Sequence, residues 1–238
     1  MTDPVEQSAA FLRAVKLDEP VAEYEDDIAT LDSDRLAAAL DTDGARTAFW
    51  VNVYNAATQC ALEADPDQYE DRRTFFSEPR VTVAGTHLSL DDIEHAILRR
   101  SYPKWTLGYL RWPFRDEFAE VHQPTERDPR IHFALNCGAE SCPAIAAYAR
   151  NDIDEQLDWT AEGYLDSTVE YDPEAGRALV PRVMLWFRGD FGGKRGILDM
   201  LERYDQIPLG ASPRLSYREW DWSLDIGAFA EEEPAETD

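Results

Sequence analysis

The residues best suited to chemistry lie in one short stretch, DPRIHFALNCGAESCP, which runs from Asp128 to Pro143. It contains one of the chain's four histidines and two of its three cysteines. Thiolates are strong nucleophiles and metal ligands, and a histidine takes up or releases a proton near neutral pH. The stretch therefore predicts a site that depends on thiol chemistry.

Within this stretch, Cys142 is the preferred nucleophile and Cys137 is the alternative. Proline is favoured at the first position of a helix, so Pro143 predicts a short helix to about Arg150 with Cys142 as its N-cap. Unpaired N–H groups and the helix dipole would lower the pKa of a thiol there below about 8.5. The competing interpretation is an inert thiol in a tight turn, because free cysteines are usually small buried apolar residues.

The residues before the cysteines carry a large apolar side chain at every second position, which is typical of a buried strand. The apolar positions are Ile131, Phe133 and Leu135, and the positions between them are His132, Ala134 and Asn136. His132, on this predicted strand, is one of two candidate bases for the thiol.

A second set of polar residues lies on a strongly apolar helix predicted over Thr47–Asp65. Asn52, Asn55 and Gln59 fall within about 60° of one another on a helical wheel, so three amides share one stripe. Buried amides need hydrogen-bond partners. These amides either tie neighbouring loops to the helix, or they have a functional role, which would be to orient a catalytic histidine or to bind substrate.

His95 is the other candidate base. It lies in a helix predicted directly after a hairpin that covers Pro79–Leu90 and turns at Ala84-Gly85. Asp91 and Arg99 are each four residues away from it. His95 is therefore either an oriented base or one member of an exposed charge ladder.

Together these residues suggest a thiol-dependent hydrolase or acyltransferase that acts on an amide, ester or isopeptide bond. The candidate catalytic residues are Cys142, Cys137, His132, His95, Asn52 and Asn55. Backbone N–H groups from Gly138 to Cys142 would complete an oxyanion hole. The substrate would be a small molecule or a peptide.

Two other functions fit the same residues. His95, His132, Cys137 and Cys142 are side chains of the kinds that zinc prefers, so a structural zinc site is the second interpretation. A non-catalytic interaction module is the third, and it needs no reactive thiol. The segment FGGKRG lacks the final Lys-Ser/Thr of a phosphate loop, so we expect no nucleotide and assign no cofactor.

The charge of the chain is extreme: 48 acidic and 23 basic residues among 238 give a formal net charge of -25. This balance predicts adaptation to concentrated salt, where exposed carboxylates hold water and salt screens their repulsion. It argues against nucleic acids and membranes as partners, because no patch of basic residues is present to contact phosphates. The N-terminal residues lack the features of a signal peptide, so we expect a cytoplasmic protein. The sequence does not predict an oligomeric state.

The order of predicted elements favours an α+β fold in a single domain, with N-terminal helices and a small, mainly antiparallel sheet flanked by helices. The sheet would consist of the hairpin, a second hairpin over Val169–Val183 and the strand that carries His132. We divide the chain into an N-terminal helical region (1–44), a main domain (45–225) and an acidic, disordered tail (226–238).

Four blocks of sequence resemble the family called domain of unknown function 547. The blocks are FWVNVYNA (49–56), LSLDDIEHAILR (88–99), DPRIHFALNCGAESCP (128–143) and WDWSLD (220–225). The resemblance covers roughly residues 45–225. It supports the choice of blocks and implies no activity, so the mechanism must come from the residues themselves.

Lowering the salt concentration should expand or unfold the protein. The screening length grows from about 3 Å at 1 M salt to about 30 Å at 0.01 M, so the excess carboxylates would then repel one another across the molecule. Thermal melts followed by circular dichroism across this range would test the prediction. A melting temperature that does not change with salt would contradict it.

Overall fold

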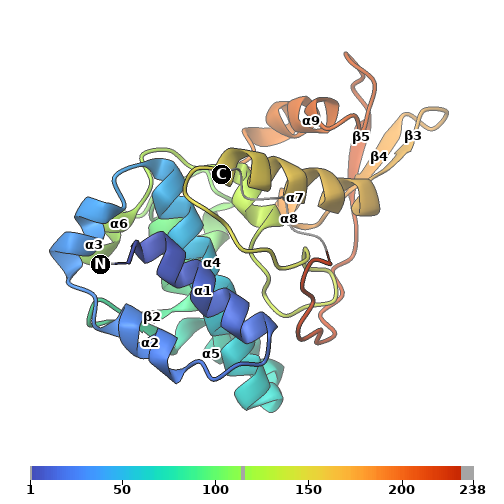
Figure 1. Cartoon of the computed structure of the whole chain (residues 1–238). Helices are drawn as coiled ribbons and strands as arrows, with labels where there is room; N and C mark the ends of the chain where they lie inside the picture. The colour runs from blue at the N-terminus through green and yellow to red at the C-terminus, as the bar shows by residue number, and fades with distance from the viewer. Residues whose placement is uncertain (1, 114–115, 232–238) are drawn as a thin grey trace.

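The computed structural model describes residues 2–113 and 116–231, and it has the predicted α+β class (Figure 1). Its α-helices are α1 (Pro4–Lys16), α2 (Ala22–Ala29), α3 (Ser33–Ala39), α4 (Asp43–Ala64), α5 (Arg72–Ser77), α6 (Glu117–His122), α7 (Ile153–Thr168), α8 (Val183–Trp186) and α9 (Gly193–Arg203). Its strands are β1 (Pro79–Val83), β2 (Thr86–Ser89), β3 (Glu170–Asp172), β4 (Arg177–Val180) and β5 (Arg214–Tyr217). Shorter helical segments are η1 (Pro66–Asp71), η2 (Asp92–Leu98), η3 (Lys104–Thr106) and η4 (Pro129–Phe133).

Helix α4 is the central element of the larger part of the fold. Every residue of α4 from Thr47 to Gln59 is buried, which confirms the apolar helix predicted from the sequence. Helix α1 lies along it, and α2 and α5 lie close to the same end of the molecule (Figure 1). Residues of α1, α2 and α3 belong to the same hydrophobic core as α4. The described residues of the N-terminal region, 2–44, are therefore part of the main folded unit.

A second, smaller core lies at the other end of the molecule, where α7, α8, α9 and the β3–β5 sheet pack together (Figure 1). Phe133, from η4, is buried in this second core, whereas its neighbours Ile131 and Ala134 belong to the first. The segment that carries the predicted site therefore runs along the boundary between the two cores.

The strands form two separate sheets. The predicted hairpin is confirmed: β1 and β2 pair antiparallel around Ala84 and Gly85, whose φ angles are 48° and 76°. In the second sheet β3 pairs antiparallel with β4, as the second predicted hairpin requires, and β5 joins β4 in parallel. The prediction of a single sheet made of the two hairpins and a central strand is therefore wrong.

The strand predicted over Ile131–Leu135 is a turn of 3-10 helix, η4, followed by irregular backbone. Asp128 caps it by accepting a hydrogen bond from the N–H of Arg130 at 2.9 Å, and proline occupies its first turn. The residues from Ile131 to Asn136 are all buried, on both sides of the segment. Apolar alternation was therefore a poor guide to the backbone conformation here.

The helix predicted after Pro143 is also absent, so Cys142 is not an N-cap. The backbone groups that a helix would use are bound elsewhere: the Pro143 carbonyl accepts a hydrogen bond from Asn136 Nδ2 at 2.8 Å. The backbone N–H of Ile145 donates to Ala228 at 2.8 Å, and the Ile145 carbonyl accepts from Ala230 at 2.9 Å.

These contacts also correct the predicted disordered tail over residues 226–238. Within residues 226–231, Phe229 packs against the first core and Ala230 is buried, and the N–H of Gly227 donates to Gln59 Oε1 at 2.8 Å. The remaining residues, 232–238, lie outside the part that the structure describes.

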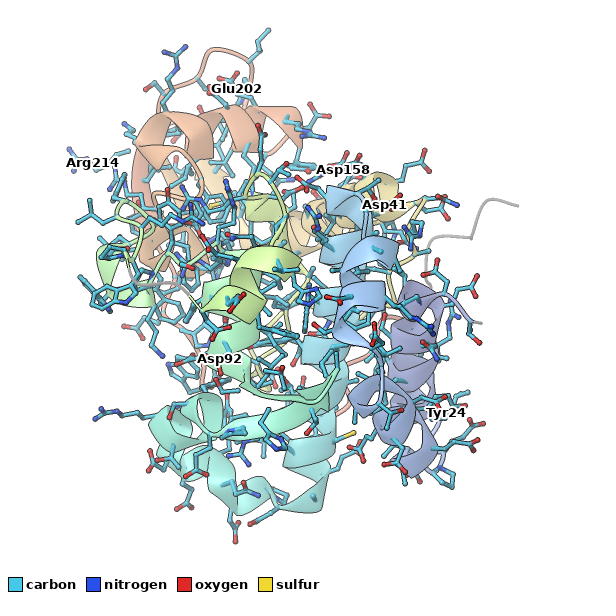
Figure 2. The ribbon with its side chains drawn as sticks, turned by 90° about the vertical axis from the view of Figure 1, so that its left-hand side faces the viewer. Tyr24, Asp41, Asp92, Asp158, Glu202 and Arg214 are labelled. Carbon is cyan, nitrogen blue, oxygen red and sulfur yellow. The ribbon has the colours of Figure 1, made fainter. Side chains whose placement is uncertain are left out.

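Charged side chains project from the outer surface, among them Asp41 before α4 and Glu202 on α9 (Figure 2). Within residues 2–113 and 116–231, no helix combines the length and apolar character needed to cross a membrane.

Replacing Asn52 by Ala should lower the free energy of unfolding by about 2 to 4 kcal/mol, because it leaves buried polar groups of Tyr148 without partners. Asn52 Nδ2 donates to the Tyr148 carbonyl and its Oδ1 accepts from the Tyr148 N–H, both at 2.9 Å. Urea unfolding would measure the loss. Asn151→Ala is the matched control: Asn151 is exposed, so its replacement should cost less than about 0.5 kcal/mol. Equal losses in the two variants would contradict this account.

Candidate functional site

A cavity of about 360 Å³ opens at the boundary between the two cores. Its volume is in the range that small-molecule sites occupy. Much of its wall is aromatic, with side chains from Tyr54, Phe76, Trp105, Trp186, Phe187, Trp220 and Trp222. Its polar lining consists of Asp91, Glu94, His95, Lys104, His132, Cys137 and Cys142. Four of the six predicted site residues, two cysteines and two histidines, therefore meet at one cavity.

The other two predicted residues, Asn52 and Asn55, do not line the cavity. Asn55 is fully buried on α4, where its Oδ1 accepts from the N–H of Asn136 and its Nδ2 donates to the Ala134 carbonyl, both at 2.9 Å. Asn52 binds the backbone of Tyr148 in the same way. Of the two roles expected for these amides, the structure shows the first: Asn52 and Asn55 tie neighbouring loops to the helix.

The loop between the two cysteines is fixed from inside by Asn136. Its Nδ2 donates to the Pro143 carbonyl and its Oδ1 accepts from the N–H of Gly138, each at 2.8 Å. Gly138 has a φ of +85°, and a Cβ at that position would lie 2.5 Å from Leu62 Cδ1. The backbone conformation and the contact with Leu62 would both be strained by any other residue, so this turn strongly favours glycine.

The C-terminal segment 221–225 fixes the same loop from outside. The N–H of Glu140 donates to the Ser223 carbonyl at 2.8 Å, and the N–H of Asp225 donates to the Gly138 carbonyl at 2.9 Å. Most of the block WDWSLD therefore supports the cysteine loop, and its two tryptophans also line the cavity.

The two thiols face each other. Cys137 Sγ and Cys142 Sγ are 2.9 Å apart, both cysteines are free, and the N–H of Cys137 donates to Cys142 Sγ at 3.1 Å. Burial opposes ionisation of Cys142, but hydrogen bonds from the Cys137 thiol and from the N–H groups of Cys137, Ala139 and Gly138 outweigh it and lower its pKa. The hydrogen bond to Cys142, together with burial, raises the pKa of Cys137 well above its ordinary value. Of the two thiols, Cys142 is therefore the one that ionises more readily.

The predicted direction of the Cys142 pKa agrees with the structure, although the predicted cause, a helix N-terminus, is wrong. The amides that surround this sulfur belong to a loop. Several of the N–H groups from Gly138 to Cys142 that were expected to form an oxyanion hole already have acceptors. The N–H of Cys142 donates to the Ala139 carbonyl, and the N–H of Glu140 donates to the Ser223 carbonyl. Cys60 differs: burial, with the charges of Glu25 and Glu63, raises its pKa to about 12.

His132 is oriented by a carboxylate that the sequence did not suggest. His132 Nε2 lies 2.9 Å from Asp190 Oδ2, and both side chains are almost completely buried. The imidazole stacks on Phe187 with ring centroids 4.1 Å apart. Burial lowers the pKa of His132 more than Asp190 raises it, so the ring is neutral at neutral pH. Asp190 accepts a hydrogen bond from the Nε2–H group of His132, which leaves Nδ1 as the basic nitrogen.

Asp190 lies in a dense cluster of charges. Arg99, fully buried, donates from Nε to Asp190 Oδ2 at 2.6 Å, and Arg127 donates to Oδ1. Burial would raise the pKa of Asp190, but hydrogen bonds from His132 and Arg99 lower it well below the ordinary range. Asp190 is therefore ionised. Sequence reasoning missed it because it lies 58 residues from His132 and 91 from Arg99, with no motif around it.

His95 is bound differently. It lies in η2, a π-helix. Such helices are rare in proteins, and those that occur are often found at functional sites. Its Nδ1 lies 3.1 Å from Arg99 Nη1, which can only donate, and its Nε2 lies 3.4 Å from Asp91 Oδ1. Both ring nitrogens are thus engaged by neighbours. His95 is less suited than His132 to remove a proton from the thiol.

The four side chains proposed as zinc ligands line one cavity without forming a ligand cluster. Across the described part of the chain, no three or more His, Cys, Asp and Glu side chains are grouped closely enough to hold a metal ion. The Nε2 atom of His132 and the Nδ1 atom of His95 are occupied by Asp190 and Arg99.

Comparison with protein families gave a match over much of the chain. Neither the curated proteins nor the solved structures compared with the chain gave a match. The family described as "Protein of unknown function, DUF547" matches residues 39–165, which contain α4, the π-helix with His95, and the cysteine loop with His132. The match covers more than half of the chain and agrees with the resemblance noted in the sequence, and the chain therefore belongs to the DUF547 family.

Proposed function

We propose that the protein is a thiol-dependent hydrolase or acyltransferase, with Cys142 as nucleophile, His132 as general base and Asp190 as the residue that positions His132. One observation carries this proposal: the Cys142 thiol and the neutral His132 of the His132–Asp190 pair line the same cavity. Nucleophile, base and orienting group are the three parts that covalent acyl transfer requires.

The reaction would proceed in two steps. His132 Nδ1 takes the Cys142 proton as the sulfur attacks the carbonyl carbon, and the leaving group departs with that proton to give a thioester on Cys142. Water, or an acceptor amine or alcohol, then loses a proton to His132 and attacks the thioester. The carboxylic acid or the new ester or amide leaves, and the thiol is restored.

The cavity wall points to the kind of acyl group that would bind. Trp186, Trp220 and Trp222 contact one another with ring centroids 5.2 to 5.9 Å apart, and Phe187 continues this aromatic surface. Such a wall favours an apolar acyl or aromatic group of small-molecule size. The proposed setting is the cytoplasm, where thiols remain reduced.

The experiment is turnover of thioesters and p-nitrophenyl esters whose acyl groups range from acetyl to long alkyl and aromatic. Cys142→Ala should lower kcat/KM at least about 10³-fold, because the nucleophile is lost, and His132→Gln should lower it about 10²- to 10⁴-fold. Mass spectrometry should show the acyl group on the peptide that contains Cys142.

Cys60→Ala is the matched control, and it should keep turnover within about twofold of the unmodified chain because Cys60 lies outside the cavity lining. A folded Cys142→Ala variant with undiminished turnover would refute the assignment. So would a native protein that neither turns over these substrates nor becomes acylated at Cys142.

A further inference from the structure

The second thiol of the site is not needed as a nucleophile in the proposed acyl transfer. One sulfur nucleophile is sufficient for that reaction, yet Cys137 Sγ lies 2.9 Å from Cys142 Sγ and both line the cavity. A disulfide has an S–S distance of about 2.05 Å, so the two sulfurs need to approach by only about 0.9 Å. This separation is small enough for bond formation without a change of fold.

The surrounding contacts hold the loop in this arrangement. The Gly138 and Ser141 carbonyls accept hydrogen bonds from Asp225 N–H at 2.9 Å and from Tyr164 Oη at 2.8 Å. Within the loop, the N–H of Cys142 donates to the Ala139 carbonyl at 2.8 Å. Because these contacts fix the loop backbone, a bond between the sulfurs costs little additional conformational entropy.

The two thiols are also unequal, as an exchange reaction requires. Three loop N–H groups surround the Cys142 sulfur and favour its thiolate, whereas Cys137 is the hydrogen-bond donor to it. The attacking thiol in disulfide exchange must be a thiolate, and the resolving thiol must lie close to the mixed disulfide. Cys142 meets the first requirement and Cys137 the second.

We propose that Cys137 and Cys142 form a redox couple that closes reversibly into an intramolecular disulfide by exchange with a low-molecular-weight disulfide. The Cys142 thiolate attacks one sulfur of RS–SR, forming a mixed disulfide and releasing RS⁻. Cys137 then loses its proton to RS⁻ and attacks Cys142 Sγ, which releases the second RS⁻. The two cysteines are oxidised by two electrons, and the small disulfide is reduced to two thiols.

This inference rests on the proposed function only in using the same Cys142 sulfur as the nucleophile. Closing the disulfide removes the nucleophile, so the couple would switch off acyl transfer under oxidising conditions. Exchange itself needs neither His132 as a base nor an acyl substrate.

The test equilibrates the full chain in molar salt with mixtures of reduced and oxidised glutathione, then quenches it in acid and alkylates it under denaturing conditions. Trypsin releases residues 131–150, with both cysteines, separately from residues 47–72, with Cys60. Under oxidising mixtures peptide 131–150 should become lighter by two hydrogen atoms and carry no alkyl group. Cys60 should stay alkylated, and dithiothreitol should reverse the change.

Two variants separate the roles of the cysteines. Cys137→Ser should accumulate a stable glutathione adduct on Cys142, whereas Cys142→Ser should slow the reaction of the remaining loop thiol by about tenfold or more. Cys60→Ser is the matched control and should close the disulfide as the unmodified chain does. Circular dichroism melts would establish that each variant is folded.

The proposal is overturned if both loop thiols remain alkylated under oxidising mixtures, or if the unmodified chain stops at the mixed disulfide. A chain that turns over thioesters without closing the disulfide would refute this inference alone. A chain that closes the disulfide without acyl transfer would refute the proposed function and leave the redox couple supported.

Discussion

The site depends on one buried carboxylate. Asp190 is almost fully buried, and its Oδ2 receives hydrogen bonds from both Arg99 and His132, of which His132 lines the cavity. Arg99 itself is fully buried and lies over the Phe187 ring with its guanidinium carbon 4.4 Å from the centroid. Removing one member of such a buried pair typically costs about 3 to 5 kcal/mol, because the other charge is left without a partner. This cluster therefore links the π-helix, the 3-10 helix and the chain before α9.

The same constraint joins structure to chemistry. Because Asp190 occupies Nε2 of His132, the imidazole is held in one orientation and one tautomer. A second, independent constraint positions the thiols: Asn55 on α4 binds the backbone on either side of Leu135, and Asn136 closes the turn that follows. The histidine and the cysteines are thus fixed by different parts of the fold and meet at the boundary between the two cores. Sites between packed units are common, since such boundaries are where cavities form.

The sequence predicted those features whose causes are local. The turn at Ala84 and Gly85 and the long buried helix through Asn52 both follow from short-range patterns, and both are present. The amide stripe on that helix also identified side chains that are buried and hydrogen-bonded. Local patterns failed where tertiary contacts decide the conformation. Pro143 begins no helix because its carbonyl is bound by Asn136.

Asp190 could not have been found in this way, because its partners are distant in the sequence and its own neighbours carry no motif. The sequence correctly predicted a lowered pKa for Cys142, but it attributed the shift to a helix N-terminus that the structure does not contain at this residue. A loop of N–H groups, closed by Gly138 and by the C-terminal segment, does what a helix N-terminus was expected to do. The chemistry of a short motif can thus be read from its residue types, while the geometry that supports it depends on the rest of the chain.

The most direct test of this account is nitrogen NMR of the His132 imidazole as a function of pH, with His132→Gln used to assign its signals. The account predicts a neutral ring protonated on Nε2 at neutral pH and a pKa below the ordinary value of about 6.5, because burial disfavours the charged form. A ring protonated on Nδ1, or one that titrates at or above 6.5, would contradict the proposal that Asp190 orients His132 as the general base for Cys142.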